Sequence, residues 1–312
     1  MKLTILHDYR PDPKWGGAEQ NMIALCDEAE KQGHTIAWYG FEKADEGMKF
    51  EAPTPDKVDG DILILGSISI LDPRWVNDIV ERFAGRIVAW CHDAPWCFTR
   101  CGSCEGQYQP QHKGCQMGWY WHLYRKASVV LCYSPLHEQR INNVFPGVET
   151  EVLPIFCDRA SVFYEARHLP TKQDSVIVVG RQSHAKGGLG TMIFAKRNPQ
   201  YHVDVYGNMP DEIKKQFAEI ENVTLHGHVD HELLPELYGA HEYFFHQPEV
   251  LDAGPRTLVE ARLAGCKLIT NNRLGYPTHP VWDCEDERLV KGCKQAMAFT
   301  LDTILKVGDA NV

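Results

Sequence analysis

The sequence predicts an α/β protein with two domains, and two observations support this prediction. Short β-branched runs alternate with segments of helical periodicity along most of the chain, a pattern typical of parallel α/β layers. The chain has 312 residues, more than a usual single domain, and residues 154–174 form an irregular stretch that suits a domain boundary. We therefore expect an N-terminal domain over residues 1–160, a C-terminal domain over residues 161–292 and a closing helix over residues 293–312.

The N-terminal domain contains a series of short apolar runs, each suited to a strand that is buried on both faces. After the first run, residues 18–32 carry apolar side chains on one helical face, and Gly33 supplies a stop signal. We expect strands over residues 2–7, 35–39, 62–65, 86–90 and 129–133.

The C-terminal domain repeats this alternation. Its expected strands cover residues 175–179, 201–206, 223–225, 242–245 and 267–270. Its expected helices cover residues 191–197, 211–220, 232–238 and 256–263. In an open parallel sheet, the loops that follow the strands lie at the carboxyl edge, where ligands bind.

Composition and charge exclude several classes of protein. Lys and Arg number 32 against 42 Asp and Glu, a formal net charge of −10, which argues against non-specific nucleic-acid binding. No apolar run reaches the roughly 18 to 20 residues that span a bilayer, and His7 and Asp8 follow the first apolar run at once, unlike a signal peptide. We expect a cytoplasmic protein with no nucleic-acid partner and no integral membrane segment, and the sequence leaves its oligomeric state open.

A pair of glycines precedes the first expected helix. Gly16 and Gly17 lie in the loop between the first strand and the helix over residues 18–32. Glycine lets a backbone come close to a ligand, and a helix N-terminus offers amide donors and the positive end of its dipole to an anion. The pair indicates a ligand-binding loop, and a tight turn without a ligand is the alternative.

The C-terminal domain opens with a strand-to-helix loop that carries two cations between glycines. Arg181 and Lys186 stand five residues apart, with Gly180 before them and Gly187 and Gly188 after them. An arginine fork can hold two phosphate oxygens and a lysine adds a point charge, so the loop suits a diphosphate. Two solvated surface cations are the alternative.

Two acids follow a later strand, one before a helix and one inside it. Asp252 follows the strand over residues 242–245, and Glu260 comes eight residues later, about one turn inside the helix over residues 256–263. Asp252 is placed to accept protons from sugar hydroxyls and Glu260 from a ribose, with two solvated carboxylates as the alternative. The turn between the acids is expected to meet a phosphate and consists of Gly254, Pro255, Arg256 and Thr257.

The chain has 11 cysteines, and an odd number without a secretion signal argues against a disulfide framework. Four thiolates at tetrahedral-ligand spacing in a reducing compartment indicate a structural zinc site, with an iron–sulfur cluster or free buried thiols as alternatives. This Cys-rich insert covers about residues 91–118, and the expected ligands are Cys97, Cys101, Cys104 and Cys115. The residues that could replace one ligand are Cys91, His92 and His112.

Three of these motifs together resemble the retaining, nucleotide-sugar-dependent glycosyltransferases of family 4. They are the glycine pair with Ala18 and Glu19 after it, the loop from Gly180 to Gly187, and the segment from Asp252 to Glu260 followed by Ala264 and Gly265. The resemblance covers most of residues 1–275. It implies the GT-B fold, in which two Rossmann-like domains face each other across a cleft and the C-terminal domain holds most of the nucleotide.

The resemblance also implies a hexosyltransferase that moves a sugar from a UDP- or GDP-linked donor to a sugar or lipid-linked acceptor, with retention at the anomeric carbon. His92 would contact the donor sugar near the reacting carbon, and Arg181 and Lys186 would stabilise the leaving diphosphate. Gly16 and Gly17 would face the donor phosphate and the acceptor. No catalytic divalent metal is expected, because the two cations and the helix dipoles supply the positive charge.

Two features depart from the family pattern, and two other functions stay open. The family usually has glutamate where this chain has Asp252, and the chain is short, so the sugar, the base and the acceptor are not determined. A nucleotide-sugar epimerase would share the architecture but needs further carboxylates that the sequence does not identify. A non-catalytic scaffold that binds a nucleotide sugar is the third possibility.

Overall fold

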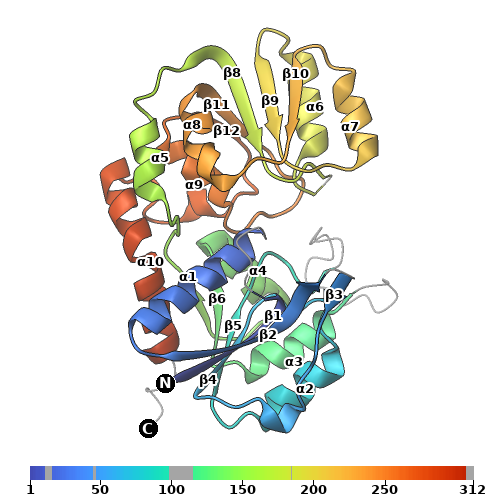
Figure 1. The fold of residues 1–312 in the computed structure, drawn as a ribbon, viewed down its shortest axis with the longest axis vertical. Coiled ribbons are helices and arrows are strands. Elements are labelled where there is room, and N and C mark those ends of the chain that lie inside the picture. The colour runs from blue at the N-terminus through green and yellow to red at the C-terminus, as the bar shows by residue number, and fades with distance from the viewer. Residues whose placement is uncertain (11–15, 45–46, 98–114, 184, 307–312) are drawn as a thin grey trace. The chain divides into compact units, whose positions relative to one another are not determined.

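The computed structural model describes residues 1–10, 16–44, 47–97, 115–183 and 185–306, and the chain divides into two compact units. The first unit comprises Met1–Phe156 and the C-terminal segment from Gln295, and the second comprises Cys157–Lys294. Each unit is built on a parallel or largely parallel sheet with helices packed on it (Figure 1). The expected α/β class with two Rossmann-like halves is therefore confirmed.

The first unit contains a seven-stranded sheet in the order β3-β2-β1-β4-β5-β6-β7. Its pairings are parallel except that of β2 with β3. The chain passes from β1 to β2 on one side and then crosses to β4 on the other, so a switch point lies between β1 and β4. The strands are β1 (Lys2–Tyr9), β2 (Thr35–Ala44), β3 (Gly47–Lys49), β4 (Ile62–Leu65), β5 (Arg86–Trp90), β6 (Val129–Cys132) and β7 (Thr150–Val152).

Three helices of the first unit were not expected from the sequence. Two of them begin at a capping residue followed by proline: Asp72 accepts a hydrogen bond from the backbone N–H of Arg74, and Ser134 accepts one from the N–H of His137. The helices of this unit are α1 (Gly17–Lys31), α2 (Pro73–Arg82), α3 (Met117–Lys126) and α4 (Pro135–Val144), with a short 3₁₀ turn η1 (Pro55–Lys57).

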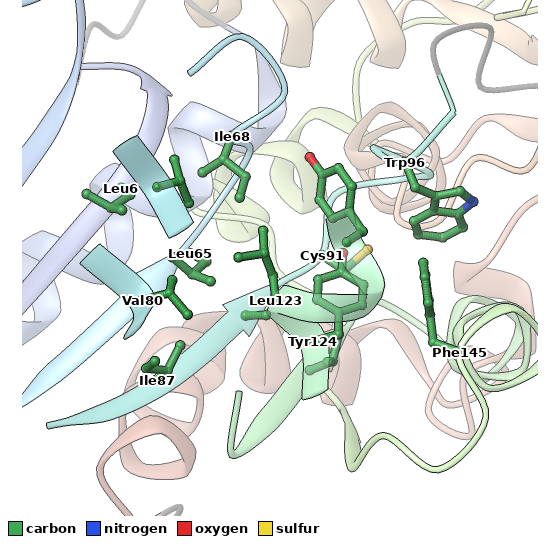
Figure 2. Close-up of a cluster of buried hydrophobic side chains, with 14 of the residues drawn as sticks. Leu6, Leu65, Ile68, Val80, Ile87, Cys91, Trp96, Leu123, Tyr124 and Phe145 are labelled. Carbon is green, nitrogen blue, oxygen red and sulfur yellow. The ribbon is translucent and has the colours of Figure 1, made fainter. Parts of the chain in front are cut away.

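The core of the first unit has an aliphatic part and an aromatic part (Figure 2). Leu6, Leu65 and Ile87 form the aliphatic part on neighbouring strands. Trp96 packs edge-on against Phe145, with ring centroids 5.1 Å apart, at the aromatic end. Because Trp96 is only 2% exposed, the start of the Cys-rich insert is anchored in this core.

The second unit has a five-stranded parallel sheet in the order β10-β9-β8-β11-β12. Here the chain runs outward from β8 through β9 to β10 and then crosses back to β11, so the switch point lies between β8 and β11. The strands are β8 (Lys172–Val179), β9 (His202–Tyr206), β10 (Val223–Gly227), β11 (His241–His246) and β12 (Lys267–Thr270).

One helix of the second unit corrects an expectation. α5 (Ala160–Ala166) lies inside residues 154–174, where no regular element was expected, and its seven residues are too few to show a helical period in sequence. The other helices are α6 (Gly188–Arg197), α7 (Asp211–Ala218), α8 (Leu234–Gly239) and α9 (Arg256–Leu263), with 3₁₀ turns η2 (His231–Leu233) and η3 (Tyr276–Thr278).

The last helix, α10 (Asp286–Lys306), has residues in both units. Within the first unit, the Arg86 guanidinium at the start of β5 donates a hydrogen bond of 2.8 Å to the Leu305 carbonyl and so fixes the end of α10 to the sheet. Among the described helices, none combines the length and the apolar character that a bilayer span requires.

Candidate functional site

The switch point of the second unit brings two distant loops together. Strands β8 and β11 are neighbours in the sheet, so the loop that starts at Gly180 and the loop that starts at Gln247 leave the same edge. A backbone hydrogen bond of 3.1 Å from the N–H of Glu249 to the carbonyl of Ala185 joins the two loops. The expected cation loop and the expected acidic segment therefore lie together at this edge of the sheet.

Gly187 allows this close approach. Its φ of +90° lies in the left-handed region, and a Cβ placed there would lie 2.5 Å from the carbonyl oxygen of Gln247. Any other residue would combine backbone strain with a collision against backbone. Gly187 is also the N-cap residue of α6, whose first turn is thereby held beside the second loop.

The two loops meet through an ion pair. Nζ of Lys186 lies 3.1 Å from Oδ2 of Asp252, and Nε2 of His246 lies 2.9 Å from the same oxygen. Burial by itself raises the pKa of the Asp252 carboxyl, but Lys186 and His246 outweigh burial and hold that pKa well below its usual range. Asp252 is therefore a carboxylate over the whole physiological pH range, available as a hydrogen-bond acceptor.

Arg181 is placed differently from Lys186. Its side chain is exposed at the start of the same loop and forms no hydrogen bond or ion pair with another described residue. The next residue, Gln182, is 2% exposed and donates from Nε2 to the Gly180 carbonyl at 3.0 Å, which fixes the loop beneath Arg181. Lys186 is held against a carboxylate, whereas Arg181 extends into solvent from a rigid base.

The second acid of the motif lies in its own buried network. Oε1 of Glu260 lies 3.0 Å from Nε2 of His231 and 3.7 Å from the guanidinium of Arg256, which in turn lies 2.6 Å from Oδ1 of Asp158. Burial alone would lower the pKa of the Arg256 guanidinium. The neighbouring carboxylates of Glu260 and Asp158 raise that pKa by more than burial lowers it, so the guanidinium stays charged. Each acid thus has its own partners: Lys186 and His246 for Asp252, and His231 and Arg256 for Glu260.

The expected phosphate turn lies at the N-terminus of α9. Pro255 is the N-cap residue of α9, and Arg256 and Thr257 are its first two helical residues. Pro255 has no amide hydrogen, so only the amides of Gly254, Arg256 and Thr257 remain as donors toward a phosphate.

In the first unit, His92 belongs to a hydrogen-bonded chain at the carboxyl edge of the sheet. Its Nδ1 lies 2.8 Å from the hydroxyl of Tyr133, and that hydroxyl accepts a hydrogen bond of 2.9 Å from Nδ2 of Asn21. The ring of His92 also stacks on Trp90, with centroids 5.7 Å apart. The expected catalytic histidine is therefore fixed by residues from α1, β5 and the end of β6.

His7 is a second histidine at this edge that the sequence analysis did not assign. It is fully buried, and its ring centroid lies 5.8 Å from that of His92. Burial lowers the pKa of His7 to about 4, although Asp8 raises it. A Cβ on Gly66 would lie 2.4 Å from the His7 ring, so glycine is required at the start of the loop after β4.

Asp8 ties that loop to the end of β1. Its Oδ2 accepts hydrogen bonds of 2.8 Å from the hydroxyls of Ser67 and Ser69, and its Oδ1 accepts one of 2.9 Å from the backbone N–H of Ile70. The position of His7 and Asp8 at the carboxyl end of the first strand was the one signal in the sequence that could have identified them.

The glycine pair lies at the start of α1. Gly16 is the N-cap and Gly17 the first helical residue, and both are exposed. The φ of Gly16 is −72°, a value that any residue adopts, so its backbone conformation does not require glycine. A glycine at this position instead leaves the amides of the helix N-terminus open to a ligand.

The predicted zinc ligands fall partly outside the described residues. Cys97 and Cys115 pair across an isolated antiparallel bridge, which brings the two ends of the Cys-rich insert together. Cys101 and Cys104 lie in residues 98–114, outside the described part of the chain. Among the described residues, no group of three or more His, Cys, Asp or Glu side chains could hold a metal ion.

One family model and several solved structures match this chain. Residues 163–308 match the family model for glycosyl transferases group 1. The match covers the ion pair of Lys186 with Asp252, the network of Glu260 with His231 and Arg256, and α9. No curated protein matches the sequence.

Solved glycosyltransferases share the fold over nearly the whole chain. Sucrose-phosphate synthase from Thermosynechococcus elongatus superposes with a TM-score of 0.71 at 15% identity, covering 98% of this chain and 92% of that one. Anabaena HepE in complex with UDP and glucose gives a TM-score of 0.59 at 15% identity, covering 99% and 98%. An alpha-glucosyltransferase in complex with UDP gives 0.60 at 13% identity, covering 98% and 100%. The chain thus has the fold of GT-B glycosyltransferases, and the group 1 domain supports a glycosyl-transferring enzyme.

Proposed function

We propose that this protein is a retaining hexosyltransferase that takes a sugar from a UDP- or GDP-linked donor. The observation that supports this best is the ion pair of Lys186 with Asp252 at the switch point of the second unit, 3.1 Å from nitrogen to oxygen. It places a cation for the diphosphate beside a permanent carboxylate for the sugar hydroxyls, which are the two parts of a nucleotide sugar. Neighbours bound to UDP favour uridine as the base.

The diphosphate is the leaving group, so the protein needs positive charge where negative charge develops. Arg181 contributes an exposed fork and Lys186 a point charge from one loop, and the N-terminus of α6 adds its dipole. These groups are fixed before the reaction and stabilise the departing diphosphate electrostatically. Because they supply this charge, the proposal needs no divalent metal at the diphosphate.

The transfer itself exchanges one bond to the anomeric carbon for another on the same face. The bond from this carbon to the diphosphate oxygen breaks, the acceptor hydroxyl oxygen forms the new bond, and the departing diphosphate takes the hydroxyl proton. Asp252 orients the donor sugar by accepting from its hydroxyls, and Glu260, held by His231, accepts from the ribose. His92, fixed by Tyr133, contacts the sugar near the reacting carbon, and Gly16 and Gly17 open the backbone toward donor and acceptor.

The proposal has three further parts. The acceptor is a sugar or a lipid-linked acceptor, and the enzyme works in the cytoplasm. The Cys-rich insert binds a structural zinc through Cys97, Cys101, Cys104 and Cys115. The zinc part of the proposal is tested by metal analysis of the purified protein. One zinc per chain, lost when Cys101 and Cys104 are both replaced by Ser, supports it, and a chain purified without metal contradicts it.

The experiment that tests the function is a thermal-shift screen with UDP, GDP, ADP and their common sugar conjugates, followed by sugar release from each conjugate that binds. A ligand that binds the folded state alone raises the melting temperature. A selective shift followed by slow release of the sugar supports a transferase and identifies the donor. Binding without release supports a scaffold, and conversion of the donor into another nucleotide sugar supports an epimerase.

A further inference from the structure

His7 occupies a closely fitted position near the carboxyl end of β1. Its side chain is fully buried, and its ring centroid lies 5.8 Å from the ring of Trp38 in β2 and 5.8 Å from the ring of His92 after β5. Gly66, directly after β4, leaves the room that the His7 ring fills, because a Cβ there would lie 2.4 Å from this ring. The ring is therefore confined by residues from three neighbouring strands or their ends.

The surroundings of His7 fix its charge and the position of its proton. Burial lowers the pKa of His7 to about 4, although Asp8 raises it, so the ring is neutral at physiological pH. The backbone N–H of Tyr9 donates to Nδ1 at 3.4 Å, which assigns the proton of the neutral ring to Nε2. Nε2 is buried and has no hydrogen-bond partner among the described residues.

Packing alone does not account for a histidine in this position. A buried N–H donor without a partner is less stable than an apolar group of similar size. Leucine or methionine would fill a similar volume and leave no donor unpaired. The ring of His7 therefore has a use that offsets this loss of stability.

Two further buried polar atoms near His92 have no hydrogen-bond partner within the described part of the chain. They are Nε1 of Trp90 and Oδ1 of Asn21. Trp90 stacks on His92, and Asn21 donates through Nδ2 to the hydroxyl of Tyr133, which lies beside Nδ1 of His92. Groups that lower stability are typical of places where function outweighs packing, so this grouping points to His92 as the residue that its surroundings serve.

The contact between His7 and His92 is directional. The two ring planes meet at 76°, so the edge of one ring meets the face of the other, an arrangement in which aromatic rings attract each other. Trp90 stacks on His92 at an interplanar angle of 20°, and the Tyr133 hydroxyl lies 2.8 Å from Nδ1 of His92. These three contacts hold the ring of His92, and an aliphatic side chain could not reproduce the one from His7.

We propose that His7 is a positioning residue, which holds the ring of His92 in the orientation that the transfer requires. This inference rests on the proposed transferase function, in which His92 contacts the donor sugar near the reacting carbon. His7 does not touch the sugar, because its side chain is sealed from solvent. It therefore affects the chemical step and leaves the binding of the nucleotide unchanged.

The test measures sugar release from UDP-glucose, or from the conjugate that gives the selective thermal shift. His7→Leu is expected to lower kcat at least about fivefold, with the Kd for UDP unchanged, because only the orientation of His92 is lost. His7→Met also fills the space without a ring and should behave in the same way. His122→Leu, at a partly exposed histidine of α3, is the matched control and should keep the wild-type kcat. A wild-type kcat in both His7 variants overturns the proposal.

A double-variant cycle shows whether His7 acts through His92. Tyr133→Phe removes another of the contacts that hold the His92 ring. Once the ring is released, the loss of His7 should matter less, so the fall in kcat for the double variant should be clearly smaller than the product of the two single falls. A fall equal to that product shows independent effects and overturns the proposed route through His92.

Stability separates positioning from a packing role. His7→Leu removes the unpaired donor, so its free energy of unfolding in urea at pH 8 should not fall below that of the wild type. Between pH 6.5 and 4 the unfolded wild type binds more protons at His7 than the folded state does, so the wild type loses stability as the pH falls. The leucine variant lacks this loss. A variant that loses stability and UDP affinity together with kcat overturns the proposal.

The outcomes separate this inference from the proposed function. No sugar release by the wild type from any conjugate removes the transferase proposal, and the positioning role falls with it. Equal sugar release by the wild type and the two His7 variants, with intact UDP binding, removes the positioning role alone.

Discussion

The ammonium group of Lys186 lies 3.1 Å from the carboxylate of Asp252, and the two residues lie in loops that follow β8 and β11, strands that are neighbours in the sheet but distant in the chain. This relationship joins two motifs that the sequence presents separately. In the proposed function, Lys186 contacts the diphosphate of the donor and Asp252 accepts from its sugar hydroxyls. The proposal therefore expects binding and orientation of the donor to be coupled at this contact.

Replacing Lys186 with Ala tests the role of this cation. The variant is expected to lose at least about 100-fold in kcat/KM for sugar release from the donor, because a charge-assisted contact to the leaving group is removed. Asp252 keeps its hydrogen bond from His246, so unfolding should require only about 1–3 kcal/mol less free energy. Kinetics and urea unfolding of the same preparation measure both effects.

Lys267→Ala is the matched control in the same unit. Its ammonium forms an exposed pair with Glu242 at 2.8 Å, away from the two loops. We expect unchanged turnover and stability in this variant. Equal turnover in Lys186→Ala and Lys267→Ala would remove Lys186 from the mechanism.

Gly187→Ala is expected to destabilise the protein by about 2–4 kcal/mol, because a methyl group at positive φ would collide with the Gln247 carbonyl. The comparison variant is Gly292→Ala in α10, where a Cβ meets nothing within 4 Å. That change should stabilise by about 0.5–1 kcal/mol through helix propensity. Denaturant midpoints at constant slope give both values, and a loss of similar size in the two variants would contradict the steric argument.

Two buried histidines of the first unit predict an acid-dependent loss of stability. Burial lowers the pKa of His7 to about 4, and it lowers the pKa of His137 to about 4. In the unfolded chain each titrates near 6.5, so between pH 6.5 and 4 the unfolded state binds more protons and stability falls as pH falls. The free energy of unfolding decreases by about 3 kcal/mol per histidine at most.

Urea unfolding at a series of pH values between 8 and 4 measures this dependence. His137→Gln is expected to be less stable at pH 8, because His137 accepts from the Tyr133 N–H and contacts the Asp93 carbonyl, but to show a shallower slope below pH 6.5. His168→Gln replaces an exposed histidine and should keep the full slope. A slope unchanged by His137→Gln would contradict the assignment of this loss to buried histidines.

Tyr133→Phe removes the hydroxyl that connects Asn21 to His92. We expect kcat to fall about tenfold or more, with the Kd for UDP unchanged, because the proposed nucleotide contacts belong to the second unit and the variant frees only the orientation of His92. Stability should fall by about 1 kcal/mol for the lost hydrogen bonds. A fall in UDP affinity equal to the fall in kcat would show a general structural effect instead.

Much of the strand framework could be predicted from sequence. The strands Ile62–Leu65, Arg86–Trp90 and Lys267–Thr270 and the helix Arg256–Leu263 have the predicted bounds, because each is a compact apolar segment with a clear limit. β2 is longer than predicted, since its extension pairs with β3 in a hairpin that carries no apolar period. The helices α2 and α4 were missed although Asp72-Pro73 and Ser134-Pro135 are start signals.

The candidate site was predictable in part. The chemistry of these residues is visible in sequence, because the cations Arg181 and Lys186 between glycines after a strand suit a phosphate ligand and the carboxylate of Asp252 after a strand suits sugar hydroxyls. Their partners His246 and His231 could not be assigned, since their contacts depend on strand order and on the path of the loop before α8.

The measurement that tests the central claim most directly is a calorimetric titration of UDP into the wild-type protein and into the Arg181→Ala and Lys186→Ala variants. The account predicts a single site in the wild type and a Kd that rises at least about tenfold in each variant, since each loses a cation at the diphosphate. Wild-type affinity for UDP in both variants, or no UDP or GDP binding by the wild type, would contradict the account.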